Sequence, residues 1–210
     1  MIKITLVLIC LFALSLAHAQ INAVTETGEE VILYDDGTWK YQNEEELEVK
    51  EIPTNSNKFE KNKESTFLLK SNNLNVGIYI NPKKWSFRKA TENPDAEYEL
   101  QLKDGDLYGM VITEKVEIPL ETLKSIAIEN AKAVSPDLKI VKEEYRIVNG
   151  IKVLLLQMNG TMKGIKVSYY GYYFSSTNGT IQFVTYTSQN LMDSYRPKSE
   201  KLLNGLVEIN

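Results

Sequence analysis

The sequence predicts an α+β fold in which an antiparallel β-sheet packs against helices, with a separate β-hairpin ahead of it. Three observations lead to this prediction. Strand-like runs alternate with Asn-Gly and Asp-Gly pairs, which favour hairpin turns. One apolar stripe at helical spacing lies midway, from Leu120 to Val134, and a second helical run, Leu191 to Leu206, closes the chain. The order of strands, helix, strands and helix favours a sheet that is covered by helices.

Residues 1–19 have the pattern of a secretory signal peptide. Lys3 precedes an apolar run from Ile4 to Leu16, and small residues, Ala17 and Ala19, occupy the −3 and −1 positions of a cleavage site. The run is shorter than the roughly 20 residues that span a bilayer. We therefore expect cleavage near Ala19, a periplasmic or secreted protein, and no integral membrane segment in the mature chain.

The positions of two residues exclude several kinds of chemistry. Cys10 and His18 are the only cysteine and histidine of the 210 residues, so cleavage would remove both. Thiol and imidazole catalysis, disulfides and zinc sites built on these side chains would then be excluded. The formal net charge of −4 would become −5 with the loss of Lys3, which argues against nucleic-acid binding through a broad basic face.

The segment 20–42 is predicted to form a short β-hairpin. The strand-like run Val31–Tyr34 and the return strand Thr38–Tyr41 flank Asp35-Asp36-Gly37, which is typical of a tight turn. Trp39 and Tyr41 should share one face. Because two strands alone are marginally stable in water, the hairpin is expected to dock on the main domain or on a partner. The string resembles a short element at the N-termini of exported proteins of the Bacteroidetes group.

Residues 43–64 are predicted to be a polar flexible linker. The segment includes Glu44-Glu45-Glu46 and further charged and polar residues. Such low hydrophobicity and high charge are typical of chain that cannot bury enough surface to become ordered.

Residues 65–210 have the size of one globular domain. Its predicted strands are, in order, Phe67–Leu69, Asn75–Ile80, Trp85–Arg88, Tyr98–Leu102, Leu107–Val116, Leu138–Val148, Ile151–Met158, Lys166–Phe174 and Ile181–Thr187. The predicted turns include Asn149-Gly150, Asn159-Gly160 and Asn178-Gly179. Pro119 should begin the first helix and Ser135-Pro136 should end it, whereas Arg196-Pro197 should break or delay the start of the second.

This order of elements resembles the PsbP-like (Mog1/PsbP-like) family over about 145 residues. The matching segments are Val76–Trp85, which ends in Pro-x-x-Trp, then Leu120–Val134, Ile147–Leu154, Tyr169–Phe174, Ile181–Tyr186 and the closing helix. The resemblance implies an α/β/α sandwich that serves as a binding or assembly module. Plant members support the oxygen-evolving complex of photosystem II, and the yeast member binds a small GTPase. The metal sites of plant members find no matching ligand residues here.

Carboxylates are the remaining catalytic and metal-binding candidates. Asp35-Asp36 and Asp104-x-Asp106 could bind calcium or magnesium, although aspartate is also favoured at tight turns for its own backbone hydrogen bonds. A glycan hydrolase or lyase could work with two carboxylates alone. We predict no cofactor and no metal, and treat this carboxylate enzyme as the alternative to a binding protein.

Aromatic residues are the candidate contact residues. On a strand, Tyr169, Gly171 and Tyr173 would share one face, and Tyr170, Tyr172 and Phe174 the other. Tyrosine is common both in cores and at recognition surfaces, so a core role and a ligand-lining role both stay open. The candidates for contact with a partner are Trp39, Tyr41, Trp85, Tyr170 and Tyr172.

The function that we expect is that of an exported, non-enzymatic binding or assembly module of the bacterial cell envelope, with another envelope protein as its partner. A small-ligand carrier that uses the tyrosine-rich strand is a further alternative. It would require a mainly apolar cavity of about 300 Å³ or more.

Overall fold

The computed structural model describes residues 21–25, 30–35, 37–42, 51–91 and 93–209. The chain divides into two compact units, residues 1–51 and residues 52–210. The predicted signal peptide, residues 1–19, and residues 43–50 of the predicted linker lie outside the described residues.

The first unit contains a three-stranded antiparallel sheet. Its strands are β1 (Ile21–Val24), β2 (Glu30–Leu33) and β3 (Trp39–Tyr41), in the order β1-β2-β3. The predicted hairpin is confirmed as β2 and β3, and Gly37 adopts the positive φ of 83° that its turn requires. β1 adds a third strand that was not predicted.

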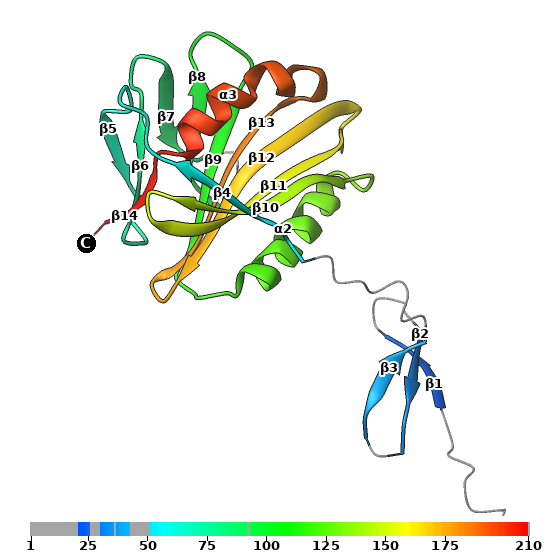
Figure 1. Cartoon of the computed structure of the whole chain (residues 1–210). Helices are drawn as coiled ribbons and strands as arrows, with labels where there is room; N and C mark the ends of the chain where they lie inside the picture. The colour runs from blue at the N-terminus through cyan, green and yellow to red at the C-terminus, as the bar shows by residue number, and fades with distance from the viewer. Residues whose placement is uncertain (1–20, 26–29, 36, 43–50, 92, 210) are drawn as a thin grey trace, which may run out of the picture. The chain divides into compact units, whose positions relative to one another are not determined.

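An eight-stranded sheet dominates the second unit (Figure 1). Its strands are β4 (Thr54–Phe59), β10 (Lys139–Val148), β11 (Ile151–Met162), β12 (Ile165–Ser176), β13 (Gly179–Ser188), β9 (Tyr108–Glu114), β8 (Ala96–Leu102) and β7 (Trp85–Lys89), in that spatial order. All neighbours pair antiparallel except β4 and β10. Short turns connect the long strands from β10 to β13, as the Asn-Gly pairs predicted, although one of the three turns lies elsewhere than expected.

A smaller sheet and two helices complete the domain. The small sheet has the order β14-β6-β5, from Leu206–Glu208, Val76–Ile80 and Phe67–Lys70. The helices are α2 (Leu120–Val134) and α3 (Met192–Leu203), and a short 3₁₀ turn, η2 (Gln189–Leu191), precedes α3. The predicted α+β class is thus confirmed, and Pro119 and Ser135 flank α2 as predicted.

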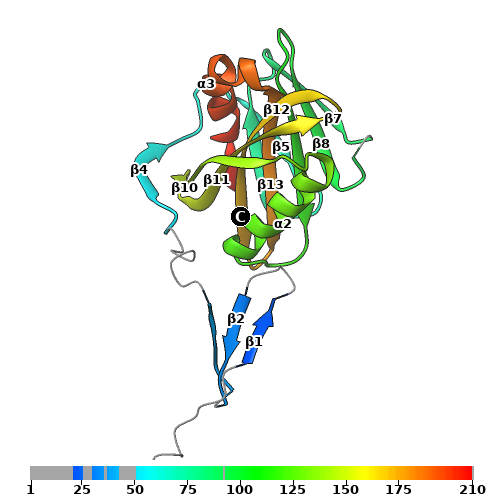
Figure 2. The ribbon, with the colours of Figure 1, turned by 90° about the vertical axis from the view of Figure 1, so that its right-hand side faces the viewer.

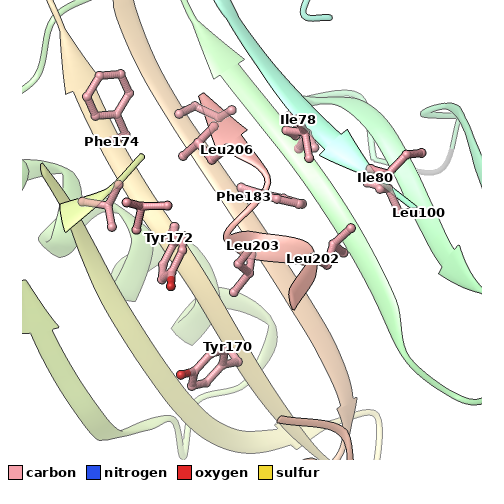
Figure 3. Close-up of a cluster of buried hydrophobic side chains, with 14 of the residues drawn as sticks. Ile78, Ile80, Leu100, Tyr170, Tyr172, Phe174, Phe183, Leu202, Leu203 and Leu206 are labelled. Carbon is pink, nitrogen blue, oxygen red and sulfur yellow. The ribbon is translucent and has the colours of Figure 1, made fainter. Parts of the chain in front are cut away.

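The two helices lie on opposite faces of the long strands (Figure 2). α3 and the small sheet bury one face, where Tyr170, Tyr172 and Phe174 of β12 pack with Leu202 and Leu203 (Figure 3). α2 covers the other face. The alternation predicted for the tyrosine-rich strand is therefore correct, and both faces of that strand are buried.

The far face of β12 contributes Tyr169 and Tyr173 to the second core cluster, together with Leu123 and Ala127 of α2. Gly171 lies between these tyrosines. A Cβ atom at this position would approach Val184 of β13 to 2.8 Å. The crowding that glycine relieves there therefore comes from the neighbouring strand.

The linker prediction is wrong for residues 54–59. These residues form β4, whose Phe59 lies opposite Val148 in the parallel pair with β10. Asn149 also binds Lys61, because its side-chain oxygen accepts the Lys61 backbone N–H at 2.9 Å. The segment is polar because β4 is an edge strand with mostly exposed side chains. Its order comes from contacts with residues almost 90 positions away, which local composition does not report.

The second helix differs from its prediction at both ends. Pro197 lies inside α3, which begins five residues earlier at Met192 and is not broken. The helix ends at Leu203, and Leu206 belongs to β14, where it pairs with Ile78 of β6. The spacing of Leu202, Leu203 and Leu206 is typical of one helical face, but the chain turns at Gly205 and Leu206 begins a strand.

The turn predicted at Asn159-Gly160 is also wrong. β11 continues through both residues to Met162, and the turn is formed by Lys163 and Gly164, with φ values of 49° and 81°. Gly160 has a packing role instead, because a Cβ atom there would lie 2.3 Å from the Ser135 hydroxyl oxygen. The glycine lets the loop that follows α2 approach the strand.

Replacing Gly205 with alanine is expected to lower the free energy of unfolding by about 3 kcal/mol or more. A Cβ atom at this position would lie 2.1 Å from the Tyr79 carbonyl oxygen. Relief of this clash would disturb the bond that the Tyr79 N–H donates to the Gly205 carbonyl at 2.8 Å. Urea denaturation followed by circular dichroism measures the loss.

Gly109→Ala is the matched control for that substitution. Its Cβ atom would meet Leu100 at 3.4 Å, an ordinary contact distance, so we expect a loss below about 1 kcal/mol. Equal losses for the two variants would show that the close approach at Gly205 is not what makes glycine necessary.

Candidate functional site

The candidate site is a solvent-open hollow of about 300 Å³ beside α3, here called the α3 hollow. Four parts of the second unit meet there: the β4–β5 loop, the β6–β7 turn, the β8–β9 turn and the C-terminal half of α3. Its lining residues are Asn62, Glu64, Ser65, Asn81, Lys84, Trp85, Leu102, Asp104, Lys198, Lys201 and Leu202. The hollow is therefore a tertiary feature that no single segment of sequence contains.

The apolar part of the lining comes from buried residues. Trp85, Leu102 and Leu202 line the hollow and are 6%, 5% and 2% exposed. Asn81 fixes the start of β7, because its carbonyl accepts the Trp85 backbone N–H at 2.9 Å and its side-chain oxygen accepts the Lys83 N–H at 3.0 Å. The Asn-Pro-x-x-Trp string thus forms the turn that holds the indole in place.

The polar part of the lining is more basic than acidic. Lys198 and Lys201 lie three residues apart on α3, a spacing that places both on the same side of a helix, and Lys84 lies across the hollow on the β6–β7 turn. Lys84 pairs with Glu64 at 3.4 Å, with both side chains about 60% exposed. The arrangement suits a ligand with an apolar part and a negative charge.

The two carboxylates of the hollow lack the surroundings of a general acid. Glu64 accepts a hydrogen bond from the Asn81 amide at 3.2 Å and pairs with Lys84, and it is exposed. Asp104 is exposed. A glycosidic general acid is typically protonated because burial raises its pKa, and neither residue is buried.

A buried charge cluster, absent from the sequence-based candidates, lies beneath α3. Arg146 of β10 is 2% exposed. Its guanidinium donates to Glu144 at 2.6 Å, to the Tyr172 hydroxyl at 3.0 Å and to Glu200 of α3 at 3.2 Å. The Tyr170 hydroxyl accepts from Arg146 at 3.2 Å and donates to Glu200 at 2.6 Å. The cluster ties β10 and β12 to α3.

The neighbours of Arg146 add to this cluster. Its guanidinium carbon lies 4.2 Å from the centre of the Phe59 ring of β4. Asn55 of β4 donates to Glu144 at 3.0 Å. The edge strand β4 is thus held by the same buried arginine, which explains why a polar segment is ordered there.

The cluster changes the ionisation of its members. Burial would raise the pKa of Glu144, but hydrogen bonds from Arg146 and Asn55 outweigh it and place the pKa below its ordinary value. Burial raises the pKa of Tyr172 to about 12. Burial and the hydrogen bond to Glu200 also raise the pKa of Tyr170. Arg146 therefore faces an ionised Glu144 and two neutral tyrosines at neutral pH.

The cluster had one signal in the sequence. Glu144 and Arg146 alternate on one strand and so share a face, which is also the face of Val148. Opposite charges at that spacing are common on exposed strands, so the pattern alone does not indicate burial. The acid on α3 that completes the cluster is 54 residues further along the chain.

The structure separates the five predicted contact residues. Trp39 is 51% exposed in the first unit, and its ring meets Tyr41 edge to face at 5.0 Å between centroids. Trp85 lines the α3 hollow although it is buried. Tyr170 and Tyr172 are fully buried, so their prediction as contact residues is wrong. Their hydroxyls bind within the domain, since the cluster above uses both, and Tyr172 also donates to Asn204 at 2.8 Å.

This burial also contradicts the carrier hypothesis in the form that we predicted. Tyr170, Tyr172 and Phe174 pack against the small sheet and α3 (Figure 3). None of these three side chains lines the α3 hollow. The α3 hollow is formed by other elements.

The predicted metal-binding aspartates lie in turns. Asp35 and Gly37 flank the β2–β3 turn, and Asp36 lies outside the described residues. The Asp106 backbone N–H donates to the Tyr195 hydroxyl at 3.1 Å, which fixes the β8–β9 turn against α3. Among the described residues, no three histidine, cysteine, aspartate or glutamate side chains form a group that could hold a metal ion.

The same architecture occurs in a solved structure. Cyanobacterial PsbP (CyanoP) from Synechocystis superposes with a TM-score of 0.52 at 12% sequence identity, covering 70% of this chain and 94% of that chain. The fold is PsbP-like. The predicted resemblance is therefore confirmed for the architecture, since identity at this level shows the fold alone.

Two further solved structures resemble the chain more loosely. The PsbP-like domain matches PA94, a Pseudomonas aeruginosa protein of unknown function, with a TM-score of 0.44 and 13% identity over 69% of this chain and 97% of that one. LpqN, described as involved in cell envelope biogenesis of Mycobacterium tuberculosis, matches with a TM-score of 0.44 and 11% identity over 64% and 83%. The sequence matches no protein-family model and no curated protein.

Within the part of the chain that the structure describes, no helix has the length and apolar character needed to cross a bilayer.

Proposed function

We propose that this chain is an exported, non-enzymatic binding module of the bacterial cell envelope, and that its PsbP-like domain binds an acidic segment of another envelope protein at the α3 hollow. The observation that carries this proposal is the lining of the hollow, where Lys84, Lys198 and Lys201 surround buried apolar side chains. A carboxylate would pair with the lysines while an adjacent apolar side chain contacts Trp85 and Leu202.

The chemistry of the hollow favours binding over catalysis. Both of its carboxylates, Glu64 and Asp104, are exposed, whereas a carboxylate pair that cleaves glycosidic bonds needs one member with a raised pKa. The expected cleavage near Ala19 would leave no histidine or cysteine to act as a base or nucleophile. The signal-peptide pattern of residues 1–19 supports an envelope location.

Charge reversal on α3 tests the proposal. The mature chain, residues 20–210 with a C-terminal tag, serves as bait in envelope extracts of the source bacterium, and captured proteins are quantified by mass spectrometry. We expect one partner to be recovered reproducibly, and the double variant Lys198→Glu/Lys201→Glu to recover roughly tenfold less of it, since close charge pairs at interfaces are worth about 1.5 kcal/mol or more.

The matched control reverses two lysines elsewhere. Lys163 of the β11–β12 turn and Lys166 near the start of β12 are exposed. Lys163→Glu/Lys166→Glu therefore makes the same change in net charge and should leave recovery unchanged. Equal recovery by the wild type and the α3 variant would contradict the assigned site. Hydrolysis of envelope glycans by the purified chain, without a recovered partner, would contradict the whole proposal.

A further inference from the structure

A second hollow, here called the tyrosine trough, lies on the face of the large sheet that carries α2. It is open to solvent and has a volume of about 420 Å³. It is formed by strands β7, β8, β9 and β13, toward the end of the sheet away from β10. The lining side chains that could contact a ligand through polar groups or tyrosine rings are Ser86, Arg88, Glu99, Gln101, Tyr108 and Tyr186.

The strand register aligns these residues in rows across the sheet. Ser86 pairs with Gln101, Gln101 with Tyr108, and Tyr108 with Tyr186. The row continues to Tyr169 on β12. Directly paired residues point to the same face, so one line of side chains crosses five strands and changes from polar at the edge to aromatic in the middle.

The aromatic part of the row is a preformed stack of tyrosine rings. The rings of Tyr108 and Tyr186 stack, with centroids 5.6 Å apart and an interplanar angle of 24°. The ring of Tyr169 packs on the ring of Tyr186, with 6.2 Å between their centroids, and Tyr169 is 8% exposed. Tyr108 and Tyr186 are half-buried, so their neighbours fix the rings while both still line the trough.

The polar part of the trough carries no net charge. Arg88 is paired with Glu99, whose carboxylate lies 2.6 Å from the guanidinium. Gln101 adds an amide that can both donate and accept hydrogen bonds, and Ser86 adds a hydroxyl. This balance differs from the lysine-rich α3 hollow and does not select for a charged ligand.

From this combination we infer that the tyrosine trough binds a short stretch of neutral carbohydrate. A sugar ring presents an apolar C–H face that packs on tyrosine rings. Its hydroxyl groups each donate and accept hydrogen bonds, which suits planar amide, carboxylate and guanidinium groups at the rim. The inference is independent of the proposed protein partner, because the two hollows have no lining residue in common.

Affinity electrophoresis and titration calorimetry of the mature chain test this inference. The probes are neutral polysaccharides and their hexasaccharides with α-glucan, β-glucan, xylan, mannan and chitin linkages. We expect at least one neutral probe to bind, Tyr108→Ala to weaken that binding at least tenfold, and Gln101→Ala to weaken it severalfold. Melting temperatures of both variants establish that they fold.

The controls separate this site from other surfaces and from the proposed function. Trp39 is an exposed aromatic residue of the first unit, 51% exposed, and does not line the trough, so Trp39→Ala should leave sugar binding unchanged, as should Lys198→Glu/Lys201→Glu. The trough variants should in turn recover the protein partner normally. The inference is overturned if no neutral probe binds, if only acidic polysaccharides bind, or if binding survives in a folded Tyr108→Ala protein.

Discussion

Replacing Arg146 with methionine is expected to lower the free energy of unfolding by about 3–5 kcal/mol, the usual result of removing one partner from a buried charge cluster. Methionine retains much of the packing volume but removes every guanidinium donor. Glu144, which is 10% exposed at its side chain, and Glu200 would then lose their shared cation. The hydroxyls of Tyr170 and Tyr172 would lose a charged partner as well.

Chemical denaturation followed by circular dichroism measures the loss, and an exposed arginine provides the control. Arg88 pairs with Glu99 but is 61% exposed at its side chain, so Arg88→Met should cost less than about 1 kcal/mol. Arg146→Lys should fall between the two, because one ammonium group cannot reach all the acceptors that the planar guanidinium reaches. Wild-type stability in Arg146→Met would show that the cluster contributes no net stability.

Alkaline pH is expected to destabilise the domain steeply between pH 10 and about pH 12. Burial raises the pKa of Tyr172 to about 12 from its ordinary value of 10.0. Burial and the hydrogen bond to Glu121 likewise raise the pKa of Tyr145 to about 12. In this interval the unfolded chain loses phenolic protons that the folded chain retains, so the free energy of unfolding falls as pH rises and is unaffected by these groups below pH 10.

The expected contribution of Tyr172 alone is about 2–3 kcal/mol, from the difference between its folded and unfolded pKa values. Urea denaturation at stepped pH values gives the dependence, and ultraviolet absorbance of the phenolate shows whether ionisation coincides with unfolding. Tyr172→Phe should reduce the slope, whereas Tyr34→Phe in the first unit should not. Ionisation of all twelve tyrosines near pH 10 in a still folded protein would contradict the prediction.

Local patterns were sufficient wherever one element is amphipathic along its own length. The stripe from Leu120 to Val134, bounded by Pro119 and Ser135-Pro136, predicted α2 to the residue. The alternation from Tyr169 to Phe174 predicted the two faces of β12 correctly, because the period of a strand is fixed by backbone geometry. Each of these patterns can be recognised from residues that are close together in the sequence.

Patterns failed where a distant segment decides the outcome. β4 is ordered because Phe59 and Asn55 meet Arg146 and Glu144, and the composition of residues 43–64 gives no sign of this. The Asn159-Gly160 pair stays in β11, where Gly160 packs near Ser135. Tertiary packing therefore outweighs the local preference of Asn-Gly for a turn. The α3 hollow and the tyrosine trough escaped prediction for the same reason, since each collects side chains from at least three elements.

The sequence by itself determined the class of the fold and the order of most strands and both helices, but not β1, β4 or β14. It also gave the export signal as an expectation, and a supply of reactive groups without histidine or cysteine once that signal is removed. These properties depend on local periodicity and composition. Only the tertiary structure decided that Tyr170 and Tyr172 are core residues tied to Arg146. It alone also decided that Trp85 lines one hollow with three lysines, and that Tyr108 and Tyr186 line another. The reason is that burial and charge pairing depend on which distant segments pack together. An alternating strand with aromatic residues on both faces does not specify what will cover either face.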